Sequence, residues 1–133
     1  MMTMTQLTPT DGELAILRVL WSRGAPMTVR EVHDVLSRGK DTAYTTVLKM
    51  LTIMAEKGLV TRDETERSHR YAAVHEESKV QGSLLRDLLD RAFDGSALAL
   101  VQRALDAKAA DPAELDAIAD LIAEARRRPR RRP

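Results

Sequence analysis

Residues 41–58 constrain the fold most, because this segment reads as a helix with two very different faces. Apolar side chains recur in it at helical spacing, as on a helix that packs one face against a core. We expect Asp41 or Thr42 to cap the start. Lys57 and Gly58 suit the end, as a cation near the last carbonyls followed by a residue free to adopt positive φ. The apolar positions are Ala43, Val47, Met50, Leu51 and Met54.

The opposite face of this predicted helix carries short hydroxyls and one cation. Threonine can hydrogen-bond base edges or phosphates and contact a thymine methyl, and lysine can reach guanine or a phosphate. The face is therefore a DNA-reading surface or a solvated surface, and the helix alone leaves both open. In the first interpretation Thr45 and Lys49 point into the major groove, while Thr42 and Thr46 bind phosphate at the N-terminal turn. Tyr44 lies at the edge of the buried face, where its hydroxyl can reach a phosphate.

Two shorter helices are predicted before this segment. The first begins with Thr8 as a hydroxyl cap, followed by proline, and ends at Gly24. The second opens with Thr28 and Glu31, which have the spacing of a capping box, and closes near Gly39. Helices joined by a few residues around a glycine predict a helix-turn-helix, whose second helix enters the major groove of DNA.

After Gly58 the apolar period changes to that of strands, at 59–63 and 69–74. A hairpin directly after a helix-turn-helix predicts a wing, with its arginines beside the DNA backbone. The alternative is that these arginines only neutralise the neighbouring carboxylates. We assign them to phosphates. They are Arg62, Arg67 and Arg70.

Residues 75–125 predict three short helices rich in aliphatic side chains. Ser96 caps the second of these helices, and Asp111 caps the third, followed by proline. Such helices cannot cover one another within one chain, and an exposed apolar surface marks an interface. We therefore predict a dimerisation region; the alternative is that it folds back onto the winged domain. The residues expected at the interface are Leu84, Leu85, Leu88, Leu89, Phe93, Leu98, Val101, Leu105, Leu115, Ile118, Leu121 and Ile122.

Together these elements predict a mainly α fold with a small β-hairpin. An N-terminal winged helix-turn-helix domain spans residues 1–74, and a three-helix dimerisation region spans 75–125. Residues 126–133, RRRPRRRP, are expected to form a disordered Arg/Pro tail, because prolines oppose a helix there. The tail either contacts DNA nonspecifically or keeps the protein soluble.

The distribution of charge restricts where DNA can bind. Residues 1–74 carry ten basic and nine acidic side chains, whereas residues 75–125 carry five and eleven. A nucleic-acid site therefore belongs to the N-terminal part or to the tail with its six arginines. No apolar run is long enough to span a membrane or to form a signal peptide, so we expect a cytoplasmic protein without membrane insertion.

Neither a cofactor nor an enzymatic activity is predicted. The chain has no cysteine, which excludes a disulfide, a thiolate metal site and a redox switch. Its histidines, His33, His69 and His75, share no metal-binding spacing, and we expect His33 to lie at the surface. No nucleophile–base pair, glycine-rich phosphate loop or metal cluster can be assembled from these residues.

Several segments also match one known family in their order and spacing. They are Leu7-Thr8, Glu13, Trp21, TVREVHDVL at 28–36, Ala43-Tyr44-Thr45-Thr46-Val47, Leu51, Glu56-Lys57-Gly58-Leu59-Val60, Arg70-Tyr71 and Phe93-Asp94-Gly95-Ser96. They resemble the penicillinase-repressor family (BlaI/MecI type) over about residues 7–125, most clearly in the first 74. The resemblance implies a dimeric winged-helix repressor that binds palindromic operators near genes for β-lactam resistance or related stress responses. Many such repressors are released when a membrane-bound sensor metalloprotease leads to cleavage of the dimerisation region.

Two features depart from that family. Its cleavage site is usually an Asn-Phe bond, but this chain has no asparagine, its only phenylalanine follows Ala92, and Arg103-Ala104 stands at the corresponding place. The copper-responsive branch uses C-terminal cysteine pairs as metal ligands, which a chain without cysteine does not have.

Two functions follow from the predicted helix-turn-helix. The first is a sequence-specific transcriptional repressor acting on double-stranded DNA. The second is a winged-helix protein-interaction module that does not bind DNA. An interaction helix normally exposes large apolar anchors at i, i+3, i+4 and i+7, whereas the reading face here shows threonine and lysine. We therefore favour the repressor.

Overall fold

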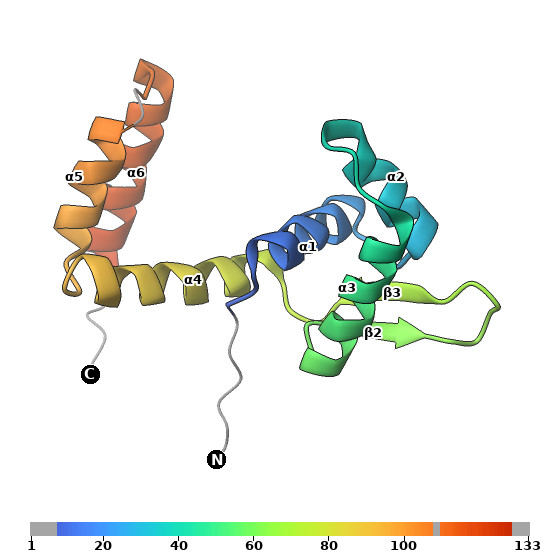
Figure 1. Ribbon diagram of the computed structural model, residues 1–133. Coiled ribbons are helices and arrows are strands. Elements are labelled where there is room, and N and C mark those ends of the chain that lie inside the picture. Colours follow the sequence, from blue (N-terminus) through green and yellow to red (C-terminus); the bar gives the residue numbers. More distant parts are fainter. Residues whose placement is uncertain (1–7, 108–109, 129–133) are drawn as a thin grey trace, which may run out of the picture. The chain divides into compact units, whose positions relative to one another are not determined.

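The computed structural model describes residues 8–107 and 110–128, in a mainly α fold with a small sheet, as predicted (Figure 1). The chain forms two compact units, residues 1–87 and 88–133. The elements in chain order are α1 (Asp11–Arg23), β1 (Met27–Thr28), α2 (Val29–Gly39), α3 (Tyr44–Lys57), β2 (Val60–Asp63), β3 (Arg70–Ala73), α4 (Glu77–Ala92), α5 (Ala97–Ala107) and α6 (Pro112–Arg127).

The sheet has three strands in the order β1-β3-β2, all antiparallel. The predicted hairpin is β2–β3, but sequence reasoning missed β1, because two residues are too few to show a strand period. In β1, Met27 pairs with Tyr71 of β3, and both side chains are buried. The order α1-β1-α2-α3-β2-β3 is that of a winged helix, in which the β2–β3 hairpin is the wing.

The helix boundaries follow local capping chemistry. Thr10, not Thr8, caps α1: its Oγ1 accepts the Glu13 N–H at 3.2 Å, and Glu13 Oε1 accepts the Thr10 N–H at 2.9 Å. Thr28 and Glu31 form the predicted capping box of α2. The predicted stop at Gly24 is confirmed, since that residue adopts φ 70°.

One aliphatic core joins the three helices of the winged helix to the sheet. It takes side chains from α1, from α2, from the inner face of α3 and from all three strands. Burial of each large aliphatic side chain contributes roughly 1.5–3 kcal/mol. This core therefore fixes which face of α3 is left for other contacts. Its residues are Ile16, Leu17, Leu20, Met27, Val29, Val32, Val47, Leu51, Met54, Leu59, Val60 and Tyr71.

The N-terminal unit continues past the predicted domain end at residue 74. Trp21 Nε1–H donates to the His75 carbonyl at 3.0 Å, which ties α1 to the segment after β3. Val80, in the first turn of α4, is only 1% exposed. The boundary between the two units therefore falls within α4, between Asp87 and Leu88.

The second unit is helical, and none of its described residues is buried. Asp94 and Gly95 take positive φ at the turn after α4, and Ser96 Oγ then accepts the Ala99 N–H, as its predicted role in capping α5 requires. The predicted Asp111 cap of α6 is also present. In α5 and α6 no described residue is buried.

The predicted start of the tail at residue 126 is wrong. Arg126 and Arg127 belong to α6, which ends with Arg128 as its C-cap, because the first proline of the tail comes only after these residues. The rest of the predicted tail, 129–133, lies outside the described residues. Among the helices of the described residues, none has both the length and the apolar character needed to cross a membrane.

Candidate nucleic-acid interface

Helix α3 begins later than the sequence predicts. Ala43 is its N-cap and makes no side-chain capping bond, so neither Asp41 nor Thr42 caps it. Thr42 lies before the helix, and its hydroxyl donates instead to the Lys40 carbonyl at 2.9 Å. Ala43, expected in the core, is exposed, because it precedes the first helical turn.

The rest of α3 divides into two faces close to those predicted. Val47, Leu51 and Met54 have no exposed surface. On the other side Thr45, Thr46 and Lys49 are exposed. All three belong to the residues that the sequence assigned to DNA contacts. The side chains of α3 thus leave a polar outer face that the core does not use.

Two features of that outer face were not predicted. Leu48 is 41% exposed, one turn beyond Tyr44, which is 39% exposed. The apolar spacing of the core face in the sequence would not have revealed Leu48, since this residue lies outside that face. Thr52 is partly buried and its hydroxyl donates to the Leu48 carbonyl at 2.9 Å, so this hydroxyl already has a partner within α3.

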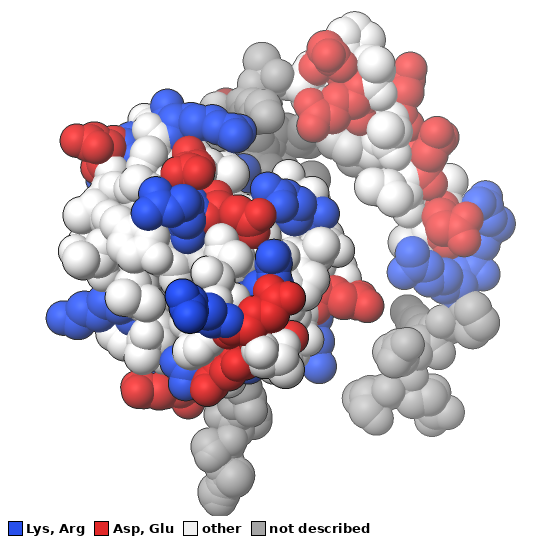
Figure 2. Space-filling model, turned by 90° about the vertical axis from the view of Figure 1, so that its right-hand side faces the viewer, with Lys and Arg blue, Asp and Glu red and all other residues white. Residues whose placement is uncertain are grey.

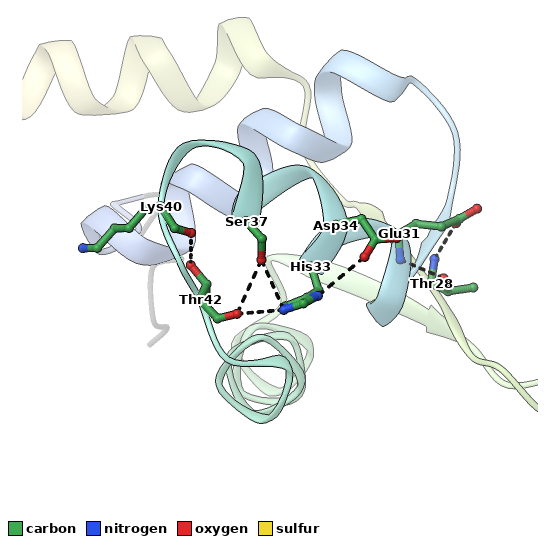
Figure 3. A network of polar contacts seen from close by, with 7 residues as sticks. All are labelled: Thr28, Glu31, His33, Asp34, Ser37, Lys40 and Thr42. Atoms are coloured by element: carbon green, nitrogen blue, oxygen red, sulfur yellow. Dashed lines mark hydrogen bonds and ion pairs between the residues drawn. The ribbon is translucent and has the colours of Figure 1, made fainter.

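A polar network holds the turn between α2 and α3 (Figure 3). His33 Nε2 lies 2.7 Å from the Thr42 carbonyl, which can only accept, so Nε2 carries the proton. Ser37 Oγ also donates to that carbonyl, at 3.4 Å. His33 Nδ1 is buried without a hydrogen-bond partner among the described residues and lies 3.6 Å from Asp34 Oδ1.

The predicted surface position of His33 is therefore wrong. Its side chain is partly buried, because it bridges α2 and the segment that leads into α3. Its ring also meets the Tyr44 ring edge-to-face, with centroids 5.8 Å apart. His33 thus connects the first helix of the helix-turn-helix to the start of the second.

The arginines of the wing differ in their partners. Arg62 Nε donates to Glu64 Oε2 at 2.9 Å, and the Tyr71 hydroxyl together with the Glu64 carboxylate raises the pKa of Arg62. Arg70 lies 3.6 Å from a carboxylate oxygen of Glu66.

Arg70 also reaches beyond the wing, since it lies 3.6 Å from Glu31 of α2. Glu31 is the carboxylate of the α2 capping box, so this ion pair connects β3 to the start of α2. Arg67 makes no ion pair with any described residue. Arg62 and Arg70 therefore do pair with carboxylates, as the alternative interpretation expected, while the assignment of Arg67 to phosphate stays a prediction.

A groove of about 460 Å³ lies between the start of α2, the outer face of α3 and the wing. Arg30 enters it from α2 with its guanidinium carbon 5.4 Å from the centroid of the Tyr44 ring. Arg30 was not predicted, although its place two residues after the Thr28 cap could have suggested a position beside α3. The lining residues are Thr28, Val29, Arg30, Tyr44, Leu48, Arg67, Ser68, His69 and Tyr71.

Figure 2 shows the side of the molecule toward which the wing projects in Figure 1. Lys and Arg side chains of the N-terminal unit are interspersed there with Asp and Glu, rather than gathered in one basic patch. Charge alone therefore does not mark a DNA-binding surface on this side of the molecule.

The predicted interface residues of the second region are largely solvent-accessible in the single chain. Leu84, Leu89, Phe93 and Ile118 are partly buried. The others are exposed, and Leu98 reaches 78%. The exposed ones are Leu85, Leu88, Leu98, Val101, Leu105, Leu115, Leu121 and Ile122.

A helix-turn-helix with an exposed polar reading face and a wing beside it defines a winged-helix transcriptional regulator of the DNA-binding kind. The sequence pattern described as penicillinase repressor matches residues 9–124. The chain belongs to this family, as the resemblance implied, and is therefore a regulator and not an enzyme.

The relatives found by sequence agree with this assignment. The chain is 42% identical over 115 residues to the transcriptional regulator BlaI of two Mycobacterium tuberculosis strains, over 86% of this chain and 82% of the relative. A solved structure of hsRosR-S4 has a similar fold, with a TM-score of 0.50 and 17% identity over 88% of this chain and 89% of that one. The solved DNA-binding domain of the repressor BlaI aligns at 25% identity and a TM-score of 0.49, over 58% of this chain and 92% of that one.

Proposed function

We propose that this regulator acts as a homodimeric repressor that binds a palindromic operator, with α3 of each protomer in the major groove. The observation that carries the proposal is the outer face of α3. Thr45 and Lys49 are exposed one turn apart, while Val47 and Leu51 anchor the opposite face in the core. Hydroxyl and ammonium groups at this spacing can reach base edges, because an α-helix fits the major groove.

The exposed apolar surface of the second region supports dimerisation. Helices α5 and α6 have no buried described residue, which is unfavourable for isolated aliphatic-rich helices in water. A second copy of the chain would cover the same surface by twofold symmetry, and the operator would then be palindromic. Its half-sites would be about 34–36 Å apart, one turn of DNA, or a multiple of that distance.

The genes controlled and the release mechanism are proposed from what the family resemblance implies. We propose that the targets are genes for β-lactam resistance or related stress responses, and that the protein acts in the cytoplasm. The resemblance to the family also implies a partner, a membrane-bound sensor metalloprotease. The Asn-Phe bond usual in the family is absent, and the bond at the corresponding place, Arg103–Ala104, lies within α5 and is exposed. Cleavage there would require local unfolding of α5, so an inducer that acts by proteolysis must first loosen this helix.

The alternative is a winged-helix module that binds another protein and not DNA. Tyr44 and Leu48 favour it to a limited extent, since they expose large side chains at i and i+4. An interaction helix normally continues this series, but the next position on that face, Thr52, is a partly buried threonine. Two apolar groups beside threonine and lysine also suit a major groove, where thymine methyls are apolar.

Selection of binding sites from a random pool of duplex DNA tests the proposal. We expect the full-length protein to enrich an inverted repeat, and a mobility shift with the enriched duplex to show one dimer per site. Enrichment of a single half-site would contradict the dimer. Failure to enrich any sequence at low salt would favour the protein-interaction module.

A further inference from the structure

We propose that the groove between α2, α3 and the wing binds a stretch of the DNA phosphodiester backbone, with Arg30 and Arg67 as its two cations. In this arrangement Arg62 and Arg70 hold the shape of the wing and do not bind phosphate. The inference rests on the proposed DNA-binding function and deepens it. It adds Arg30 to the interface and separates the three arginines that the sequence assigned together.

The lining of the groove has the charge that a phosphate needs. Arg30 and Arg67 both contribute to it, and none of its lining residues is aspartate or glutamate. Thr28 and Ser68 add hydroxyls, which also hydrogen-bond phosphate oxygens. An anion entering this groove therefore meets two guanidinium groups and no facing carboxylate.

Arg30 is held in position before any ligand arrives. Its guanidinium lies over the Tyr44 ring, and the His33 ring packs against the edge of the same tyrosine. A cation over an aromatic face gains roughly 0.5–1 kcal/mol at an exposed site, which restricts the long side chain. Less side-chain entropy is then lost when Arg30 binds a phosphate.

The other two arginines of the wing are already engaged. Arg62 pairs with Glu64, and Arg70 pairs with both Glu66 and Glu31. Each carboxylate cancels much of the guanidinium charge and would repel an approaching phosphate. Arg67 lies in the loop between these two residues in sequence and makes no ion pair with a described residue, so its charge remains available.

Salt dependence of binding separates phosphate contacts from structural roles. Each phosphate neutralised by the protein contributes about −0.9 to the slope of log K against log salt. Binding is measured for the duplex enriched from the random pool and for a random-sequence duplex of equal length, between about 50 and 200 mM salt, where phosphate contacts change the affinity strongly. The variants are Arg30→Gln, Arg67→Gln, Arg62→Gln and Arg70→Gln, with Arg18→Gln on the exposed surface of α1 as the matched control.

We expect Arg30→Gln and Arg67→Gln each to reduce the magnitude of the slope by about 0.9 and to weaken both duplexes alike. Arg30→Lys, which keeps the charge, should restore the slope. Arg62→Gln, Arg70→Gln and Arg18→Gln should leave the slope unchanged. Thermal unfolding of every variant identifies effects of stability, which would alter affinity without altering the slope.

Three results would overturn the inference. The first is an unchanged slope for folded Arg30→Gln, which would remove Arg30 from the interface. The second is a reduced slope for Arg62→Gln or Arg70→Gln, which would show that the ion-paired arginine binds DNA phosphate. The third is a parent protein that binds neither duplex, which would overturn the proposed function and the groove's ligand together.

Discussion

Lys57 Nζ lies 2.7 Å from Glu13 Oε2, so the last turn of α3 is tied to the first turn of α1. The sequence predicted a different role for Lys57, beside the last carbonyls of its own helix. Glu13 is only 5% exposed and its other carboxylate oxygen closes the α1 capping box. One carboxylate therefore fixes both the start of α1 and the end of the reading helix.

Replacing Lys57 with methionine should destabilise the protein, because the buried Glu13 carboxylate loses its cation. We expect a loss of about 1–3 kcal/mol in the free energy of unfolding, as for a buried polar group left unsatisfied. The lower end of this range applies, since the Lys57 side chain is half exposed and its charge is partly screened.

Thermal unfolding at pH 7 measures this effect. Lys40→Met is the matched control, because the Lys40 side chain is exposed and makes no ion pair with a described residue. Equal melting temperatures for the two variants would show that the Glu13–Lys57 pair adds nothing to stability.

Stability should fall in acid through two carboxylates that cap helices. Burial raises the pKa of Glu13, but the Lys57 ammonium and the Thr10 amide outweigh it and hold this pKa below its ordinary 4.5. The Thr28 amide lowers the pKa of Glu31 below the same value. A lowered pKa in the folded state means that the unfolded chain binds more protons as the pH falls.

These two groups therefore contribute stability that is fully present above pH 4.5 and is lost as the pH falls through their folded pKa values. Denaturant unfolding from pH 7 to pH 3 checks this. Glu13→Gln should start from a lower stability at pH 7 and lose less of it in acid than the parent does. Parallel curves for the two proteins would contradict the assignment.

The second region should hold the dimer together. Val101→Glu places a charge on the exposed apolar surface of α5, where a partner's side chains would desolvate it. We expect this variant to sediment as a monomer while its winged helix stays folded. Gln102→Glu, the next residue along α5 and also exposed, is the control and should remain dimeric. A parent protein that is monomeric at micromolar concentration would contradict the prediction.

His33 should position the start of the reading helix. His33→Leu removes the donor to the Thr42 carbonyl, at a cost of about 0.5–1.5 kcal/mol in the free energy of unfolding. Because α3 has no side-chain cap, we also expect weaker operator binding than this loss of stability explains. His33→Gln, whose amide can donate to the same carbonyl, should recover part of the affinity. Unchanged binding by His33→Leu would assign the histidine to stability alone.

Local signals in the sequence were sufficient for most of the fold. The Thr28–Glu31 capping box, the positive-φ stop at Gly58 and the Asp111 cap depend on residues within one helical turn, and all are present. The inner face of α3 was also predictable, because Val47 and Leu51 stand at helical spacing in the sequence and both are buried.

Features that depend on distant partners were not predictable. Strand β1 exists only because Met27 meets Tyr71, which lies on the other side of the helix-turn-helix in sequence. The partial burial of His33 depends on Thr42, and the role of Lys57 depends on Glu13. In each case the sequence shows the residue but not the group that it contacts.

Helix α3 itself should divide its contacts between bases and backbone. Thr45 and Lys49 lie one turn apart on the exposed face, so replacing either with alanine should change the preferred operator at one position, by roughly 1–3 kcal/mol. Thr46, in the first turn of α3, should contact a phosphate, and its replacement should weaken binding without changing preference. Leu48→Ala should reduce preference for a thymine.

Selection from a random pool, run on each variant beside its thermal unfolding, tests this division. Leu51→Ala is the control for folding, because deleting a fully buried aliphatic side chain should cost ~2–5 kcal/mol and lower the melting temperature. The surface variants should melt like the parent. If folded Thr45→Ala and Lys49→Ala enrich the same sites as the parent, α3 is not the reader. Specificity would then have to arise from the wing or from the sequence-dependent shape of the DNA.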